Sequence, residues 1–440
     1  MIDRLRLLTA YLQARHILRF SSREALERYQ QKKLRRFFRK TLVRSPYYAD
    51  FADRPLAGFP IMNKQIMMEN FNRINTHGID RDDALALAAR AEQTRDFVPD
   101  MDGISVGLST GTSGKRGLFL TSAAERMRWA GIVLGRMLPG SLLDTHRIAF
   151  FLRANNNLYE SVSGRGNIDF RFFDLITPLA EHLVDLRAYR PTILIAPAQV
   201  LRELARLEAA TQSGPAEAAP RPDKIISVAE VLFEDDRTAI ENIFGQRVDQ
   251  IYQCTEGFLA YTCPGGQVHL NEYFLHIEPE WLDDDRTRFF PVITDFSRTT
   301  QPIVRYRLDD VLTIDRRPCS CGSWERVISR IEGRADDILV LARTDNGATE
   351  HLMPDFVSRS LTSAADCIEE FRVVQSSHDR LSVFLKAADF KTARGQAECA
   401  LKDLAVARGL QVPKMEFAPL VGSEFMSKRR RVCRSRSIAL

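Results

Sequence analysis

The sequence predicts an α/β protein: a large N-terminal domain with mostly parallel sheets flanked by helices, followed by a small α+β domain. Short apolar runs alternate with helical stretches between about residues 100 and 300, as in βαβ units. The pattern changes after Asp336, and a length of 440 residues is typical of two or three domains. We therefore place the domains at 1–335 and 336–440, with residues 1–50 as a helical lead-in.

The elements follow from apolar patterns and from breaker residues. Residues 1–50 are rich in Arg, Leu and Gln, and the helical pattern ends at Ser45 because the residue before a proline resists helix. Residues 211–223, with Gly214 and three prolines, are predicted to be an exposed loop. Short apolar runs predict strands at 104–108, 118–120, 148–152, 192–196, 338–342 and 381–385. Helices are predicted over 203–210 and 392–407.

Composition narrows the class of protein. Hydrophobic residues make up 45% and charged residues 27%, as in a globular protein, and the net charge of +5 does not argue for nucleic acid. No apolar run is long enough for a membrane span, so we expect no integral membrane association. Residues 1–15 make a poor signal peptide and a fair amphipathic helix. Seven cysteines without a secretory signal predict a reducing compartment, the cytoplasm.

The most informative stretch is a loop of small and hydroxyl-bearing residues between two predicted strands. Glycines allow close approach of the backbone to a ligand, and successive N–H groups with Ser and Thr hydroxyls can wrap an anion. The loop is not a Walker A motif, because Ser109 and Arg116 stand where that motif needs Gly and Ser or Thr. A solvated hairpin loop is the alternative. The candidate polyphosphate ligands are Ser109, Thr110, Gly111, Thr112, Ser113 and Gly114.

Four further segments follow in a fixed order: Tyr252-Gln-Cys-Thr-Glu-Gly257, Arg305-Tyr-Arg-Leu-Asp-Asp310, Gly333-Arg-Ala-Asp-Asp337 and Ser427-Lys-Arg-Arg-Arg-Val432. Together with the loop, this series resembles the core motifs of the adenylate-forming enzymes, which include acyl-CoA synthetases, adenylation domains and luciferases. Pro302–Asp310 and Phe59–Lys64 look most like the branch of the phenylacetate–CoA ligases and deazaflavin-coenzyme synthetases. The resemblance implies activation of a small carboxylic acid by ATP, and a mobile C-terminal domain hinged at Asp336.

The resemblance also implies roles for single residues. Glu256 would bind Mg²⁺, Thr255 would contact phosphate and Tyr252 would stack on adenine; Ala229 and Glu230 look like the family's adenine-contacting segment. Asp310 would accept hydrogen bonds from the ribose, with Arg334 beside it.

Lys428 would be the catalytic lysine that bridges the carboxylate and the α-phosphate. Each assignment has a simpler alternative. Glu256 could be a solvated carboxylate, Arg305 and Arg307 a surface network with Asp, and Lys428 part of a basic tail.

Three cysteines and one histidine form a separate set: Cys263, His269, Cys319 and Cys321. A Cys₃His donor set suits tetrahedral Zn²⁺, and the adjoining Gly and Pro allow tight metal-binding turns. The segment Pro318–Gly322 also resembles a Cys-x-Cys-Gly stretch in relatives of the same branch. We expect a closed structural zinc site that joins two loops. Four unrelated side chains or a disulfide are the alternatives.

The acceptor of the acyl group is left open by the sequence. Residues 342–354 differ from the glycine-containing loop that lines the thiol tunnel in the branch. Coenzyme A, the phosphopantetheine of an acyl carrier protein, an amine and a hydroxyl are all candidate acceptors. An adenylyltransferase that stops at an AMP ester is the first alternative function. A non-catalytic scaffold that uses the zinc clip and the basic tail is the second.

Overall fold

The computed structural model describes residues 2–51, 53–94, 96, 100–109, 117–152, 167–211, 221–364, 367–421, 430–435 and 438. The chain divides into two compact units. The first comprises residues 1–287, 291–308 and 314–329, and the second comprises 288–290, 309–313 and 330–440. The boundary that the sequence suggests after Ala335 stays a prediction. In the described part of the chain, no helix has the length and apolar character needed to cross a membrane.

The first unit begins with helices. Helix α1 (Ile2–Leu12) runs into a π-helical turn (Gln13–Ile17), and α2 (Arg23–Lys40) follows. The Ser22 side chain caps α2 by accepting a hydrogen bond from the Ala25 N–H. The α-helices between α2 and the first strand are α3 (Lys64–Glu69), α4 (Phe71–Ile74) and α5 (Arg81–Thr94) in the described part of the chain.

Helix α1 packs closely on helix α6 (Ala123–Met137) because α6 offers two glycines one turn apart. A Cβ added at Gly131 would lie 2.3 Å from the Leu7 carbonyl oxygen, and one at Gly135 would lie 2.9 Å from the Tyr11 carbonyl oxygen. These distances leave no room for a Cβ atom, so only glycine fits at the two positions and the two helix backbones lie very close together. This packing fixes α1 on the body of the unit.

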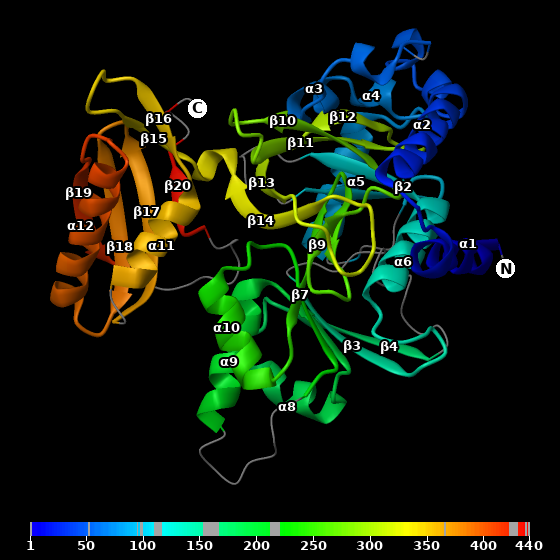
Figure 1. Ribbon diagram of the computed structural model, residues 1–440. Coiled ribbons are helices and arrows are strands. Elements are labelled where there is room, and N and C mark those ends of the chain that lie inside the picture. Colours follow the sequence, from blue (N-terminus) through cyan, green and yellow to red (C-terminus); the bar gives the residue numbers. More distant parts are fainter. Residues whose placement is uncertain are drawn as a thin grey trace. The chain divides into compact units, whose positions relative to one another are not determined.

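Five parallel strands form the centre of the first unit, in the order β4-β3-β5-β6-β7. Their bounds are β3 (His146–Leu152), β4 (Ile168–Asp174), β5 (Ile193–Ala196), β6 (Lys224–Ser227) and β7 (Val248–Cys254). Residues of one face, such as Ile148 and Ile193, join a core cluster with α1 and α6. On the other face Phe151 and Phe173 contact His182 of α8 (Leu179–Tyr189). Helix α9 (Ala198–Thr211) lies beside α8, and α10 (Glu234–Phe244) lies beside α9 (Figure 1).

The remaining strands of the first unit pair antiparallel. β1 (Ile104–Leu108) and β2 (Leu118–Ser122) form the hairpin whose connection is the predicted phosphate loop. β7 continues through a two-residue turn into β8 (Gly257–Thr262), which pairs with β9 (Val268–Leu270), and β9 pairs with the start of β14 (Val327–Arg334). β10 (His276–Trp281), β12 (Ile303–Arg307) and β11 (Arg288–Asp295) from Pro291 onward also belong to the first unit. The predicted α/β class is confirmed, with a larger antiparallel share than the apolar runs suggested.

The second unit contains a four-stranded sheet in the order β19-β18-β17-β20. Helices α11 (Pro354–Ala364) and α12 (Phe390–Ala407) contact each other, and both share one apolar core with the sheet (Figure 1). The strands are β17 (Ile368–Ser377), β18 (Arg380–Ala387), β19 (Lys414–Pro419) and β20 (Val432–Arg434). The unit also holds the start of β13 (Asp310–Asp315) and the hairpin of β15 (Leu339–Ala342) and β16 (Thr349–Leu352). The predicted strands and helix after residue 336 are therefore present.

Candidate active site and cysteine–histidine cluster

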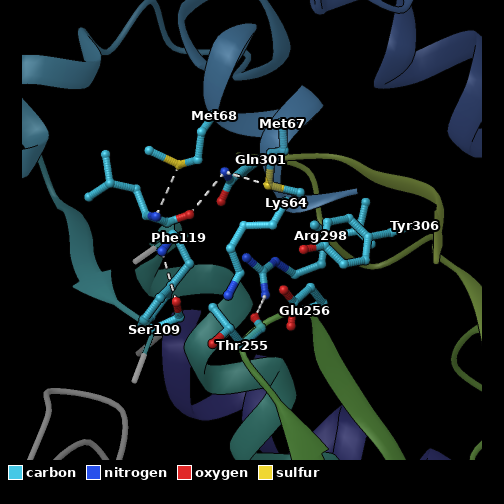
Figure 2. A pocket seen from close by; sticks show the side chains of 13 residues that line it. Lys64, Met67, Met68, Ser109, Phe119, Thr255, Glu256, Arg298, Gln301 and Tyr306 are labelled. Carbon is cyan, nitrogen blue, oxygen red and sulfur yellow. Dashed lines mark hydrogen bonds between the residues drawn. The ribbon is translucent and has the colours of Figure 1, made fainter. Parts of the chain in front are cut away.

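A pocket of the first unit collects residues from four distant segments (Figure 2). Its free volume, including open solvent, is about 300 Å³. Two walls come from predicted site segments, the β1–β2 hairpin and the β7–β8 turn; the other two come from α3 and from the stretch around β12. The lining residues are Lys64, Met67, Met68, Ser109, Gly117, Leu118, Phe119, Thr255, Glu256, Arg298, Gln301, Ile303 and Tyr306.

Ser109 closes the base of the predicted phosphate loop. Its N–H donates to the Gly117 carbonyl at 2.8 Å, and its Oγ accepts a hydrogen bond from the Gly117 N–H at 2.8 Å. These two bonds hold the two ends of the loop together at the wall of the pocket. The other five predicted loop ligands, Thr110, Gly111, Thr112, Ser113 and Gly114, lie outside the described residues.

Thr255 and Glu256 occupy the turn between β7 and β8, where Cys254 pairs with Gly257. A two-residue turn leaves its side chains pointing away from the ladder, and both residues are half-buried at the pocket. The structure therefore brings together three predicted residues, Ser109, Thr255 and Glu256. A carboxylate oxygen is a ligand that Mg²⁺ uses, and hydroxyl groups donate hydrogen bonds to phosphate oxygens.

Arg298 joins the turn to the hairpin. Its Nη1 donates to the Thr255 carbonyl at 3.2 Å and its Nη2 to the Leu120 carbonyl at 3.1 Å. The side chain is 9% exposed, and its Nε is buried without a hydrogen-bond partner among the described residues. Arg298 thus holds the Thr255 backbone against β2, and it adds a positive charge to the pocket.

Glu125, at the start of α6, is a buried carboxylate close to Arg298 and supports the wall of the pocket. Its carboxylate accepts hydrogen bonds from the N–H and the hydroxyl of Ser122 at 2.7 and 2.8 Å and from the Thr300 N–H at 2.9 Å. Burial raises the pKa of Glu125, but the Arg298 charge and the hydrogen bonds from Thr300 outweigh it and lower that pKa below its usual value. An ionised Glu125 therefore neutralises the buried guanidinium.

Lys64 enters the pocket from the first residue of α3, a helix that Asn63 caps by accepting from the Ile66 N–H. A Cβ added at Gly117 would meet the Lys64 stem at 3.5 Å, so the stem lies against the exit of the loop. Figure 2 shows the chain of Lys64 reaching down towards Thr255. Sequence reasoning noted Lys64 only as part of a motif and missed Arg298, because neither has a ligand pattern near it.

The segment that carries Lys64 is attached to β12. Met62 donates its N–H to the Arg305 carbonyl and accepts from the Arg307 N–H, each at 2.9 Å. Arg305 has φ 44°, an uncommon value for a residue with a side chain. Its guanidinium bonds to Glu278 and to the carbonyls of Ala57 and Phe59. Arg307 bonds to Glu280. Both arginines therefore serve a structural network, with glutamates in place of the aspartates that we considered.

The predicted adenine residues lie near the carboxyl ends of two neighbouring parallel strands. Tyr252 is a buried residue of β7, and Ala229 follows β6 with φ 65°, a strained value for alanine. Glu230 accepts a weak hydrogen bond from the Gln199 N–H at 3.3 Å. Ligands of open α/β sheets bind at this edge. None of these three residues lines the pocket described above.

The predicted residues of the second unit form a compact group. Arg334 Nε lies 3.5 Å from Asp310 Oδ1, and the Arg334 N–H donates to Asp337 at 2.7 Å. Asp337 also accepts from Arg430 Nε at 2.6 Å. Asp336, the predicted hinge, sits in a single 3₁₀ turn of residues 335–337. Lys428 lies outside the described residues.

The four predicted zinc ligands come together in the first unit. Their ligand atoms all lie within 4.8 Å of one another, with Cys263 Sγ 3.5 Å from Cys319 Sγ and Cys321 Sγ 3.4 Å from His269 Nε2. Tetrahedral Zn²⁺ with bonds of about 2.0–2.3 Å sets its ligands roughly this far apart. No disulfide is present among the seven cysteines. The residues therefore fit a closed Cys₃His metal site.

His269 is oriented for this site by the backbone. Its Nδ1 lies 3.0 Å from the Glu325 carbonyl oxygen, and because a carbonyl only accepts, Nδ1 carries the proton. Nε2 is then the atom that faces Cys321. Glu325 is itself buried and paired with Arg136 at 2.9 Å, and it accepts from the Tyr261 hydroxyl at 2.7 Å. The cluster thus rests on a buried ion pair, whereas the pocket rests on a buried glutamate that feels the charge of Arg298.

Comparison with known proteins bears on the fold. No family model matches the chain, and no curated protein sequence matches it. A structure of 2-hydroxyisobutyryl-CoA ligase matches with a TM-score of 0.63 at 16% identity, over 94% of this chain and 89% of that one. The amide bond synthetase McbA from Marinactinospora thermotolerans matches with 0.51 at 15% identity, over 74% and 67%.

MatB from Rhodopseudomonas palustris, in its ATP-bound structure, also matches with a TM-score of 0.51 at 16% identity, over 74% of this chain and 66% of that one. The chain therefore has the fold of these enzymes. It is the fold that the resemblance to the adenylate-forming enzymes implies.

Proposed function

We propose that the chain is an ATP-dependent ligase that activates a carboxylic acid as an acyl-adenylate and releases pyrophosphate. The observation that carries the proposal is the pocket in which Ser109 meets Thr255 and Glu256. These residues come from two segments that resemble phosphate-binding motifs and lie more than 140 residues apart in the sequence. Solved structures of the same fold hold acyl-adenylates: 2-HIB-AMP in 2-hydroxyisobutyryl-CoA ligase and anthranoyl-AMP in an anthranilate CoA ligase.

In the proposed reaction a carboxylate oxygen attacks the α-phosphorus, and the bond to the β-phosphate breaks with departure of pyrophosphate. Negative charge moves onto the leaving group, so the protein must supply fixed positive charge near it. Lys64 and Arg298 supply that charge in the pocket. Glu256 would hold Mg²⁺, which neutralises the phosphates when bound.

The other predicted roles are kept as part of the proposal. Tyr252, Ala229 and Glu230 would contact adenine, and Asp310 with Arg334 would bind the ribose. Lys428 would bridge carboxylate and α-phosphate oxygens, and Asp336 would be the hinge. The phenylacetate–CoA ligase-like branch is the assignment that the motifs favour within the superfamily.

A thiol is the proposed acceptor of the acyl group. One structure of 2-hydroxyisobutyryl-CoA ligase holds 2-HIB-AMP together with CoA, which supports CoA; an acyl carrier protein is the second candidate. An adenylyltransferase is the alternative, and one observation favours it. Residues 343–348 connect β15 and β16 at the place where the branch has its thiol-tunnel loop, and their sequence differs from that loop.

The Cys263, His269, Cys319 and Cys321 cluster is proposed to hold one structural Zn²⁺. The donor set, the spacing of its atoms and the hydrogen bond on His269 Nδ1 support it. The site would clip the β8–β9 connection to the loop before β14. The free cysteines are also in keeping with a cytoplasmic location.

The test is ATP–pyrophosphate exchange without CoA, across aromatic, hydroxylated and fatty acids, with Lys428→Ala beside the wild type. We expect exchange with one class of acid and a loss of roughly 10²–10³ in the variant. AMP retained in the product would select the adenylyltransferase. Absence of ATP binding would contradict the proposal and favour the scaffold.

A further inference from the structure

Residues 2–44 differ sharply in charge from the rest of the chain. They contain thirteen Lys or Arg residues and three acidic residues, a net charge of +10. The whole chain has a net charge of +5, so the remaining residues carry a net charge of −5. The proposed ligase reaction makes no use of this separation.

Exposed basic residues of α2 contribute a large part of this charge. Its inward residues, such as Leu26 and Leu34, are buried. Five exposed cations line the other face, and none of them forms an ion pair with any residue that the structure describes: Lys32, Arg35, Arg36, Arg39 and Lys40. No acidic residue occurs between Glu27 and Asp50.

The pKa of Lys33, on the flank of the same helix, is affected by the neighbouring positive charges. Burial lowers the pKa of Lys33, and the nearby charges of Arg128, Arg36 and Lys32 lower it further. Arg128 belongs to α6, so the positive surface extends from α2 onto that helix.

Helix α1, which packs on the same helix α6, exposes leucines. Leu5, Leu8 and Leu12 recur at helical spacing and are 65%, 45% and 37% exposed. The opposite side of α1 is occupied by the glycine contacts with α6, so the leucines cannot turn inward. Ile17, in the π-helical turn, is 62% exposed. Exposed arginines, including Arg4 and Arg6, alternate with the leucines.

We propose that α1 and α2 dock the protein on an anionic lipid surface. Leucines that alternate with arginines suit the boundary between headgroups and acyl chains, where the apolar side chains are buried and the guanidinium groups reach phosphates. The basic face of α2 adds attraction that acts over about a Debye length. A nucleic acid would engage the cations but would leave the leucines in water. The docking is peripheral, because the leucine face is one side of a helix whose other side stays on α6.

The experiment is co-sedimentation of the full chain with vesicles of phosphatidylcholine alone and of phosphatidylcholine mixed with phosphatidylglycerol. Three variant sets are compared with the wild type. The leucine set is Leu5→Ser, Leu8→Ser and Leu12→Ser; the cation set is Lys32→Gln, Arg35→Gln, Arg36→Gln and Arg39→Gln. The control set removes four exposed cations of the second unit: Arg359→Gln, Lys386→Gln, Lys402→Gln and Lys414→Gln.

We expect the wild type to bind the mixed vesicles and to be released by salt. The leucine set and the cation set should each weaken binding at least about tenfold, and the control set should not. Thermal unfolding of each variant separates lost binding from lost folding. Absence of binding to the mixed vesicles at low salt would overturn the proposal. Binding that needs the cations and ignores the leucines would also overturn it, because a nucleic acid or an acidic protein would then fit the surface equally well.

Discussion

The pocket of Ser109, Thr255 and Glu256 and the cysteine–histidine cluster are built in similar ways, yet their members could be predicted from the sequence to different extents. Each joins segments that are distant in the sequence, and each is supported by a buried glutamate that accepts hydrogen bonds and interacts with an arginine. These residues are Glu125 near Arg298 in the pocket, and Glu325 paired with Arg136 at the cluster. All four members of the cluster were found from the sequence, because their type alone limits their chemistry. In the pocket only the residues within motifs were found. The difference teaches that candidate ligand residues can be recognised from their type and their neighbours in the sequence, whereas the buried charged residues that support them cannot.

Removal of the proposed metal should have the largest effect. Cys319→Ser should lose bound zinc and lower the free energy of unfolding by on the order of 5 kcal/mol, part of the roughly 10–16 kcal/mol that zinc supplies in zinc-finger peptides. Metal analysis and chemical unfolding measure both. Cys399→Ser, an exposed thiol on α12, is the matched control. Full stability of Cys319→Ser would show that the cluster is four unrelated side chains.

Glu125→Ala should come next and should separate the two regions. The variant removes one of the two carboxylates whose charge acts on the buried Arg298 guanidinium, and it leaves the donors of Ser122 and Thr300 without their acceptor, which should cost about 3–5 kcal/mol. ATP binding should weaken while zinc content stays unchanged. Glu125→Gln keeps the shape and should cost less. If Glu125→Ala matched the exposed control Glu181→Ala in stability, the pocket would have no buried support.

A dependence of folding stability on pH should arise from His276 of β10. Burial, with the nearby Arg326 charge, lowers the pKa of His276 to about 4, and its Nδ1 bonds to Gln30 of α2 at 3.1 Å. Between pH 4 and 6.5 the unfolded state binds the proton and the folded state does not. Stability is therefore fully present above about pH 6.5 and falls by about 3 kcal/mol as the pH drops to 4.

Urea unfolding at pH 4.5 and 7 measures this term. His276→Gln should flatten the dependence over that interval, whereas His378→Gln, in the second unit, should leave it in place. An unchanged slope in His276→Gln would refute the assignment.

Lys64→Met should give the smallest effect and tests the leaving-group end of the pocket. Loss of one charged contact should weaken binding of magnesium pyrophosphate by about tenfold to a hundredfold. Binding of AMP should not change. Calorimetry measures both, with Lys402→Met as control. Equal pyrophosphate binding by Lys64→Met and the wild type would remove Lys64 from the site.

Much of the fold could be predicted, for identifiable reasons. The strands at 148–152 and 192–196 became β3 and β5 because short apolar runs between helices must be buried on both faces. The antiparallel pairing of β8, β9 and β14 was not foreseen, since apolar runs do not carry strand direction. The close packing of α1 on Gly131 and Gly135 was also missed, because two glycines in a helix acquire meaning only beside their partner.

The site was predictable where a side chain and its neighbours form a motif, as at Thr255-Glu256. Arg298 lies 43 residues from the Thr255 carbonyl that it binds and 178 from that of Leu120. Folding alone joins such groups, so no local pattern in the sequence records them.

The central claim is that the pocket of Ser109, Thr255 and Glu256 binds the phosphates of ATP through Mg²⁺. Calorimetric titration of ATP into the wild type and into Glu256→Gln, each with and without Mg²⁺, tests it most directly. We predict magnesium-dependent binding by the wild type and at least about tenfold weaker binding by the variant, which loses the charge and keeps the shape. Binding that is equal in the two proteins, or absent from the wild type, would contradict the account.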